Sequence, residues 1–116
     1  MNIQTKVTYN NGLSFKLLKS NDKKLNLHLL SSKYYSSLYS NESIPALILA
    51  NGNIGEFLEE DNIHTFASLD LGLTWKVVAK QASTFSASLY GNFLVLVQEN
   101  ELTKQMQLSM DQGYTF

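Results

Sequence analysis

Acidic and histidine side chains are the first candidates for chemistry in this sequence. Glu59, Glu60 and Asp61 form a carboxylate run, but a calcium loop needs oxygen ligands at spaced positions and a turn glycine. His28 and His64 stand far apart, and the chain has no cysteine to complete a metal site with either of them. We therefore interpret the carboxylates as a solvated loop, His28 as a strand residue and His64 as the start of a strand. No metal site is predicted.

A glycine-containing segment and a group of tyrosines offer further possibilities. Residues 51–55 read Asn-Gly-Asn-Ile-Gly, but no Lys-Ser/Thr pair follows and no helix is expected there, so a turn or bulge is favoured over a phosphate site. Tyr34, Tyr35 and Tyr39 lie in the serine-rich segment Ser32–Ser43, which is expected to be a surface loop. The sequence therefore predicts no catalytic residue and no cofactor.

The most informative pattern is an eight-residue motif that occurs three times. Its form is Ser/Thr-x-Asp/Asn-x-Gly-x-Ser/Thr-aromatic, which chance would produce on the order of once in 10⁵ positions. We call Thr8–Phe15 the first motif, Ser68–Trp75 the second and Ser109–Phe116 the third. A repeated motif indicates a repeated structural unit. Its defining residues are Asn10, Gly12, Phe15, Ser68, Asp70, Gly72, Thr74, Trp75, Ser109, Asp111, Gly113 and Phe116.

The residue types of the motif suit a tight corner between two strands. The Asp or Asn side chain is expected to accept hydrogen bonds from backbone N–H groups one to three residues ahead. The glycine allows a positive φ, and the Ser/Thr hydroxyls can satisfy other polar groups of the turn. The terminal aromatic residue is expected to lie across the hairpin as an apolar cover. All of these roles are structural.

The spacing of the motifs indicates a repeated all-β unit. The turn acceptors at positions 10, 70 and 111 are 60 and 41 residues apart, and the shorter spacing is typical of a propeller blade. We predict a β-propeller segment of about two to two and a half four-stranded blades. Residues 1–19 would end one blade, 25–80 form a full blade and 84–116 a truncated one. The expected strands are Val7–Thr8, Ser14–Lys19, Leu25–Ser31, Ala46–Ala50, Thr65–Asp70, Thr74–Lys80, Thr84–Tyr90, Phe93–Gln98 and Met106–Asp111.

Composition limits the classes of partner. The net charge of −1 gives no electrostatic footprint for nucleic acid or an anionic membrane. No apolar run is long enough to cross a bilayer, and Met1–Thr5 leads directly into strand-like sequence, so neither a membrane span nor a signal peptide is expected in this segment. Asn41-Glu42-Ser43 is a glycosylation sequon in the expected loop, which makes Asn41 a candidate acceptor.

The three motifs resemble the Asp-box of sialidase propellers and of Vps10/sortilin receptors. The second motif meets the full pattern, whereas the first departs from it with Asn10 and Phe15 and the third with Phe116. The stretch Pro45–Leu58 followed by Thr65–Val78 is similar to the Vps10/sortilin domain in particular. Its order is an apolar strand, a Gly-Asn-x-Gly turn, an Asp-box with tryptophan and another apolar strand.

This resemblance implies a receptor and not an enzyme. Proteins of the Vps10/sortilin family carry a large luminal propeller that binds cargo proteins or peptides and moves them between the Golgi and endosomes, vacuole or lysosome. The chain would then be one part of such a receptor, on the luminal side of Golgi or endosomal membranes.

Two alternatives remain open at this stage. The chain could be a truncated relic of such a receptor with no activity of its own. It could also be a fragment of an Asp-box glycosidase, but sialidase chemistry needs arginines to bind the substrate carboxylate in bidentate fashion, and all nine basic residues here are lysine.

Overall fold

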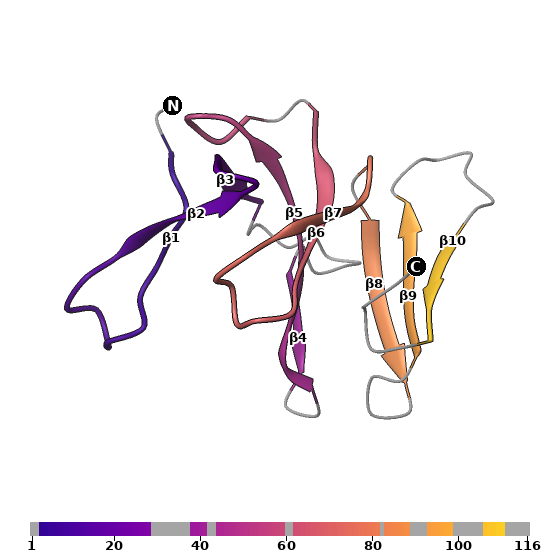
Figure 1. The fold of residues 1–116 in the computed structure, drawn as a ribbon. Helices are drawn as coiled ribbons and strands as arrows, with labels where there is room; N and C mark the ends of the chain where they lie inside the picture. Colours follow the sequence, from indigo (N-terminus) through magenta and orange to yellow (C-terminus); the bar gives the residue numbers. More distant parts are fainter. Residues whose placement is uncertain are drawn as a thin grey trace.

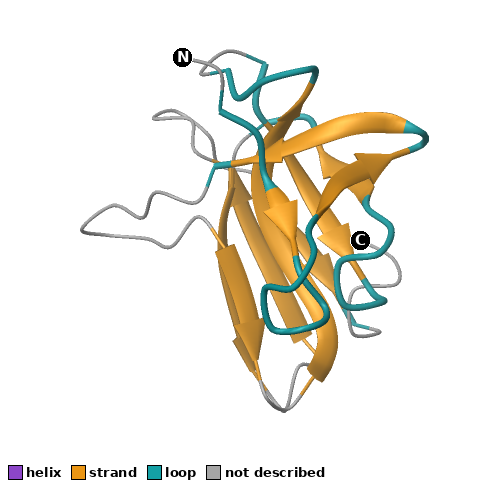
Figure 2. Cartoon of the chain, turned by 90° about the vertical axis from the view of Figure 1, so that its left-hand side faces the viewer, coloured by secondary structure: helices purple, strands orange, loops and turns teal. Residues whose placement is uncertain are grey.

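The computed structural model of this chain describes residues 3–28, 38–41, 44–59, 62–81, 83–88, 93–98 and 106–110. Every regular element within these ranges is a β-strand, and the strands form two antiparallel sheets (Figure 1, Figure 2). The all-β prediction is confirmed, and the arrangement is consistent with part of a β-propeller.

The larger sheet is built around one long strand, β5. β3 and β4 pair with successive parts of one edge of β5, and β6 pairs with its other edge. The path through the sheet is β1-β2-β3-β5-β6-β7, with β4 off this path. The seven strands are β1 Lys6–Val7, β2 Lys16–Ser20, β3 Lys23–Leu27, β4 Leu38–Asn41, β5 Ile44–Ile54, β6 His64–Ser68 and β7 Lys76–Ala79.

The smaller sheet follows directly in the chain. β8 (Ser83–Ser88) pairs with β9 (Phe93–Gln98), which pairs with β10 (Met106–Ser109), so three consecutive strands form a meander. These strands agree with the runs predicted at 84–90, 93–98 and 106–111. The β1–β2 hairpin of the first motif pairs into the same sheet as β3 to β7, so strand pairing does not separate one blade from the next. The division of the chain into blades stays a prediction.

Two local predictions were wrong. The segment Ser32–Ser43, expected as a loop, contains β4. The turn or bulge expected at residues 51–55 is mostly regular strand, because β5 runs to Ile54. Gly52 explains the second error. A Cβ added there would lie 2.3 Å from the Asn26 carbonyl oxygen, so glycine is needed for the close approach of β3 to β5 and not for a turn.

The hydrophobic core lies between the β1–β2 hairpin and the middle of the larger sheet. Its buried members come from β2, β3, β5, β6 and the end of the second motif. They are Leu18, Leu25, Leu27, Ala50, Phe66 and Trp75, and the partly buried Val7, Ile48 and Ile54 pack against them. Complete burial of a leucine or phenylalanine side chain contributes about 1.5–3 kcal/mol, so this cluster is a large apolar contribution to stability. Leu47 and Leu49 are also completely buried.

Buried asparagines supplement the core. Asn26 Oδ1 accepts from Thr5 N–H at 3.1 Å, and its Nδ2 donates to the Gly55 carbonyl at 2.9 Å. Asn53, its cross-strand partner, donates to the Phe57 carbonyl and accepts from Glu59 N–H, both at 3.0 Å. Each amide thus finds backbone partners on both of its atoms, which offsets the cost of burying it.

A third asparagine joins the two sheets. Asn51 Nδ2 donates to the Ser83 carbonyl and Asn51 Oδ1 accepts from Ser83 N–H, both at 2.9 Å. The Thr65 hydroxyl, on β6, donates to the Gln81 carbonyl at 2.7 Å and lies 2.9 Å from the Ser83 hydroxyl. The start of β8 is therefore fixed to the middle of the larger sheet by polar side chains.

Substitution Gly52→Ala tests the packing of β3 on β5. The added methyl group would meet backbone atoms of Asn26, which cannot move like the end of a flexible side chain. We expect the free energy of unfolding to fall by about 1–3 kcal/mol in urea titrations followed by Trp75 fluorescence. The control Lys80→Ala, at an exposed position, should change it by less than about 0.5 kcal/mol. Equal stability of the two variants would contradict this account of Gly52.

Candidate functional site

The first motif forms a turn that its own side chains close. Thr8 Oγ1 accepts from Gly12 N–H at 2.9 Å and donates to Asn10 Oδ1 at 2.9 Å. Asn10 Oδ1 accepts from Ser14 N–H at 2.9 Å, and Asn10 Nδ2 donates to Ser14 Oγ at 2.7 Å. The hydroxyl and the amide thus hold both halves of the turn.

The second motif repeats this network with one bond reversed, because a carboxylate oxygen accepts where the Asn10 amide nitrogen donates. Ser68 Oγ accepts from Gly72 N–H at 2.8 Å and donates to Asp70 Oδ1 at 2.8 Å. Asp70 Oδ1 accepts from Thr74 N–H at 2.9 Å, while Oδ2 accepts from the Thr74 hydroxyl. In both motifs the acceptor reaches four residues ahead, one residue further than the longest reach expected from the sequence.

The backbone of both turns has two consecutive residues with positive φ. These are Asn11 (58°) and Gly12 (89°) in the first motif, and Leu71 (63°) and Gly72 (90°) in the second. Asparagine adopts this conformation at low cost, but a leucine does so with strain of the order of 1–2 kcal/mol. Leu71 is therefore a strained residue, and its carbonyl and N–H both have defined partners.

Those partners connect the second turn to the rest of the fold. Leu71 N–H donates to the Ala46 carbonyl at 3.1 Å, at the start of β5. The Leu71 carbonyl accepts from the Tyr9 hydroxyl of the first motif at 2.9 Å, so the two turns are in direct contact. Burial and then the charge of Asp70 raise the pKa of Tyr9, which keeps its hydroxyl a proton donor.

The terminal aromatic residues of the two motifs differ. Trp75 is 5% exposed, and its indole N–H donates to the Gly72 carbonyl at 3.0 Å, so it covers its own turn and enters the core. Phe15 also lies over its own turn, since its ring is 4.0 Å from a Cβ added at Gly12, but it is 57% exposed. Both aromatic residues thus lie across their turns, and of the two only Trp75 is buried.

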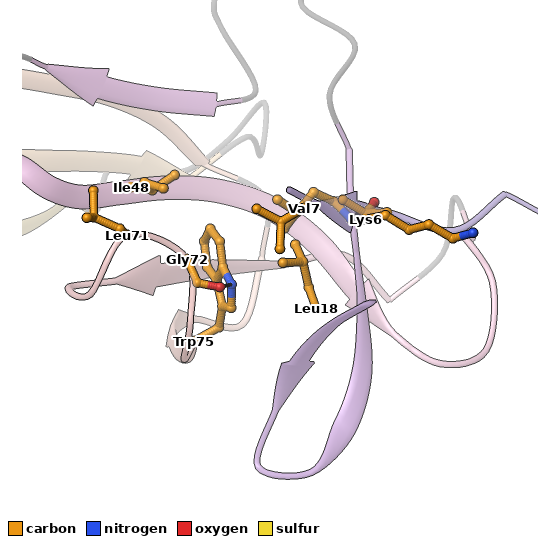
Figure 3. Close-up of a pocket in the computed structure, with 9 residues that line it drawn as sticks. Lys6, Val7, Leu18, Ile48, Leu71, Gly72 and Trp75 are labelled. Atoms are coloured by element: carbon orange, nitrogen blue, oxygen red, sulfur yellow. Dashed lines mark hydrogen bonds between the residues drawn. The ribbon is translucent and has the colours of Figure 1, made fainter. Parts of the chain in front are cut away.

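A small apolar pocket of about 180 Å³ lies where the two hairpins meet. Figure 3 shows Ile48 and Leu71 on one side, Val7 and Leu18 on the other and Trp75 at its base, with the Lys6 side chain extending away. Most of its lining is hydrocarbon; Thr5 and Lys6 are the lining residues with a hydroxyl or an amine, and the Lys6 amine points away from the pocket (Figure 3). The pocket can accommodate an apolar group.

Asp70 carries the only carboxylate of the first two motifs. Burial alone would raise its pKa, but hydrogen bonds from the Thr74 hydroxyl and N–H and from Ser68 outweigh burial, so the pKa of Asp70 is lowered. The ionised form is thus the one the turn is built to hold. This is a structural use of a carboxylate, which needs no substrate.

The other predicted residues do not join these turns. Asp111, Gly113 and Phe116 lie outside the described residues, and of the third motif only the buried Ser109 and the exposed Met110 are described. Asn41 ends β4, and its side chain also lies outside the described part. Its role as a glycan acceptor stays a prediction.

The histidines and the acidic segment occupy separate places. His28 Nε2 lies 2.9 Å from the Glu59 carbonyl oxygen, and His64 packs edge-on against Phe66 with ring centroids 6.4 Å apart. Lys24 Nζ and Glu56 Oε1 form an ion pair at 2.6 Å. Among the described residues, no three acidic, histidine or cysteine side chains gather where a metal could bind, and no helix there could span a membrane.

Sequence reasoning missed the residues that connect one turn to another. Tyr9 occupies a variable position of the motif, and Ser20, whose hydroxyl donates to the Trp75 carbonyl at 2.9 Å, lies outside it. A motif describes contacts within one turn. Contacts between turns depend on how β2 lies against the second motif, for which the sequence offers no signal.

Comparisons with a family model and with individual proteins agree on one family for this chain. The model of the family described as "Sortilin, neurotensin receptor 3" matches residues 1–116. A vacuolar protein sorting/targeting protein 10 of Debaryomyces hansenii is 37% identical over 94 residues, covering 79% of this chain and 6% of that protein. The VPS10 domain-containing receptor SorCS1 of Mus musculus is 30% identical over 129 residues, covering 96% of this chain and 11% of the receptor. The chain thus spans a small part of these relatives.

The lowered pKa of Asp70 predicts an acid-sensitive turn. A folded pKa below the unfolded value means that the carboxylate stabilises the fold above the unfolded pKa, near 3.8, and that this contribution is lost as the pH falls through the folded pKa. In Asp70→Asn, which imitates Asn10, the stability loss between pH 5 and pH 3 should be smaller than in the wild type. Thermal unfolding across this range measures it, with Asp22→Asn as the control, and parallel curves for wild type and Asp70→Asn would refute the prediction.

Relief of strain at Leu71 should stabilise the second turn. In Leu71→Asn the new residue accepts a positive φ as Asn11 does, and we expect the free energy of unfolding to rise by about 0.5–1 kcal/mol. Leu73→Asn is the matched control, because Leu73 is an exposed leucine of the same turn without a positive φ. Urea midpoints compare the two, and a stabilisation by Leu73→Asn as large as that by Leu71→Asn would show that strain is not the cause.

Proposed function

Because this chain belongs to the Vps10/sortilin family, whose members are sorting receptors, we propose that it forms part of the luminal, cargo-binding region of such a receptor. The complete receptor would bind cargo proteins or peptides and carry them between the Golgi and endosomes or vacuole. The observation that carries this proposal is the match of the family model to residues 1–116, the entire sequence.

The chemistry of the described residues supports binding over catalysis. The two carboxyl or amide acceptors that the motif places, Asn10 and Asp70, use their oxygens to close turns. The pocket between the hairpins is lined mostly by apolar side chains, and its one amine, that of Lys6, extends away from it (Figure 3). We therefore propose that the motif residues are structural, that the chain is not an enzyme and that it needs no cofactor.

The Vps10-type propeller context assigns a role to each part of the chain. The meander β8-β9-β10 would be three strands of one blade, and residues 25–80 would form a complete blade whose last two strands, β6 and β7, flank the second motif. Cargo contact would come from surfaces built on this frame, and no cargo residue is assigned.

The size and location of the natural product test the proposal. An antibody to residues 32–43 should detect a band far above 13.1 kDa that cofractionates with Golgi or endosomal membranes and resists protease until detergent is added. Endoglycosidase should reduce its apparent mass, and Asn41→Gln should remove one glycan if Asn41 is an acceptor. A band near 13.1 kDa in the soluble fraction would contradict the proposal and favour a truncated relic.

A further inference from the structure

A groove lies where β2 faces the turn of the second motif. Its volume is about 480 Å³, and it is lined by Lys16, Leu17 and Lys19 of β2 and by Leu73 of the turn. Lys16, Lys19 and Leu73 are exposed, and Leu17 is partly buried. The groove thus combines two lysines with two leucines, which distinguishes it from the mostly apolar pocket between the hairpins.

Both walls of the groove belong to the described part of the chain. The Ser20 hydroxyl, at the end of β2, donates to the Trp75 carbonyl at 2.9 Å, and the Tyr9 hydroxyl donates to the Leu71 carbonyl at 2.9 Å. These two bonds attach the first hairpin to the second turn at residues on either side of Leu73 in the sequence. The groove therefore lies between two successive hairpins, and contacts within the chain fix the position of one wall relative to the other.

Positive charge is concentrated in the part of the sheet that forms this groove. Residues 3–28, which include β1, β2 and β3, contain five lysines and one acidic residue, a formal charge of +4 with histidine neutral, whereas the whole sequence has a net charge of −1. The charged residues are Lys6, Lys16, Lys19, Asp22, Lys23 and Lys24. A local excess of one sign of charge attracts partners of the opposite sign and speeds their association.

The described acidic residues leave the two lysines of the groove without a counter-charge. Lys19 lies directly opposite Lys24 in the pairing of β2 with β3, and Glu56 Oε1 lies 2.6 Å from Lys24 Nζ. Within the residues that the structure describes, neither Lys16 nor Lys19 forms an ion pair. Asp70, in the same turn as Leu73, uses its carboxylate oxygens for groups of that turn. A carboxylate from a partner would therefore supply the missing charge and reduce the repulsion between the facing lysines.

We propose that this groove binds an acidic peptide segment of a partner protein, with carboxylates at Lys16 and Lys19 and an apolar side chain against Leu17 and Leu73. The inference rests on the proposed receptor function and deepens it, because it names a class of cargo segment and the place where that segment binds. Charge complementarity selects the carboxylates. An apolar side chain of the peptide would remove Leu73, which is 60% exposed, from water.

The shape of the site favours a peptide over an anionic membrane. Both partners would be attracted by Lys16 and Lys19. The leucines, however, line a groove of about 480 Å³ between two hairpins, which a side chain can enter and the surface of a bilayer cannot. The peptide therefore uses the lysines and the leucines together, whereas a membrane would use the lysines alone.

Fluorescence anisotropy tests this binding on the natural polypeptide that contains residues 1–116, whatever its length. The probe is the fluorescein-labelled peptide Glu-Glu-Leu-Glu-Glu, and the matched probe Gln-Gln-Leu-Gln-Gln lacks its side-chain charges. We expect the acidic probe to bind about tenfold more tightly than the glutamine probe, because only the acidic probe supplies carboxylates to the lysines. Added salt should weaken the binding of the acidic probe, since salt screens charges at exposed sites.

Substitutions that change one groove side chain at a time locate the site. Lys16→Gln and Lys19→Gln should each weaken binding of the acidic probe by about three- to tenfold, and Leu73→Ser by about two- to fivefold. Lys80→Gln and Val77→Ser are the matched controls, because both residues are exposed and lie outside the groove. Each control should change the affinity by less than about twofold. All five side chains are exposed, so the fold should be retained, and circular dichroism checks this for each variant.

Three results would overturn the proposal. One is a folded wild-type protein that does not bind the acidic probe. The second is a loss of affinity in Lys80→Gln equal to that in Lys16→Gln, which would assign the binding to net charge and not to the groove. The third is binding to phosphatidylserine vesicles that Lys16→Gln weakens while binding of the peptide is unchanged, which would assign the lysines to a membrane.

Failure of this inference is distinguishable from failure of the proposed receptor function. A large, membrane-associated product that does not bind the acidic probe would contradict the peptide groove alone. A soluble product of 13.1 kDa that binds the probe through Lys16 and Lys19 would contradict the receptor function alone.

Discussion

The structure depends on the hydrogen bonds that close each motif from within. A serine or threonine hydroxyl and an Asp or Asn oxygen hold the N–H groups of Gly12 and Ser14 in one turn, and of Gly72 and Thr74 in the other. These bonds hold two successive residues at positive φ, which non-glycine residues do not adopt without support. The conformation of the second turn places Trp75 in the core and directs the Leu71 carbonyl toward the Tyr9 hydroxyl. The position of one hairpin relative to the next follows from a few local bonds.

Hydrogen bonds from buried asparagine side chains likewise fix how the strands of the sheets meet. Asn26, Asn51 and Asn53 lie in the interior where aliphatic side chains would otherwise be expected, and each bonds to backbone groups of another segment. A buried amide without partners would cost about 1–3 kcal/mol, so these residues tolerate only one register of the strands they connect. Apolar packing supplies most of the stability, and the asparagines specify which strands meet.

The sequence predicts the features that are local. The second motif, the two flanking strands and the meander at 83–109 are all read from residue types within a few positions. The turn expected at 51–55 was wrong because asparagine and glycine are common in turns, and only the position of Asn26 behind Gly52 shows that these residues form a buried strand. Phe15 lies across its own turn, as the motif predicts, but it is 57% exposed where Trp75 is buried. The motif alone does not determine this difference in burial.

The arrangement separates the bonds that hold one repeat together from the contacts that join it to the next repeat. In a repeat protein, stability is roughly a sum of terms within repeats and terms between neighbours. Here the hydrogen bonds within each repeat are nearly identical, because a hydroxyl oxygen and an Asp or Asn oxygen accept from the same N–H groups in both turns. The contact between repeats depends on Tyr9 and Val7, at positions where the motif allows any residue. Variation at those positions changes how repeats meet and what they expose, while the turn that holds each repeat together is unaffected.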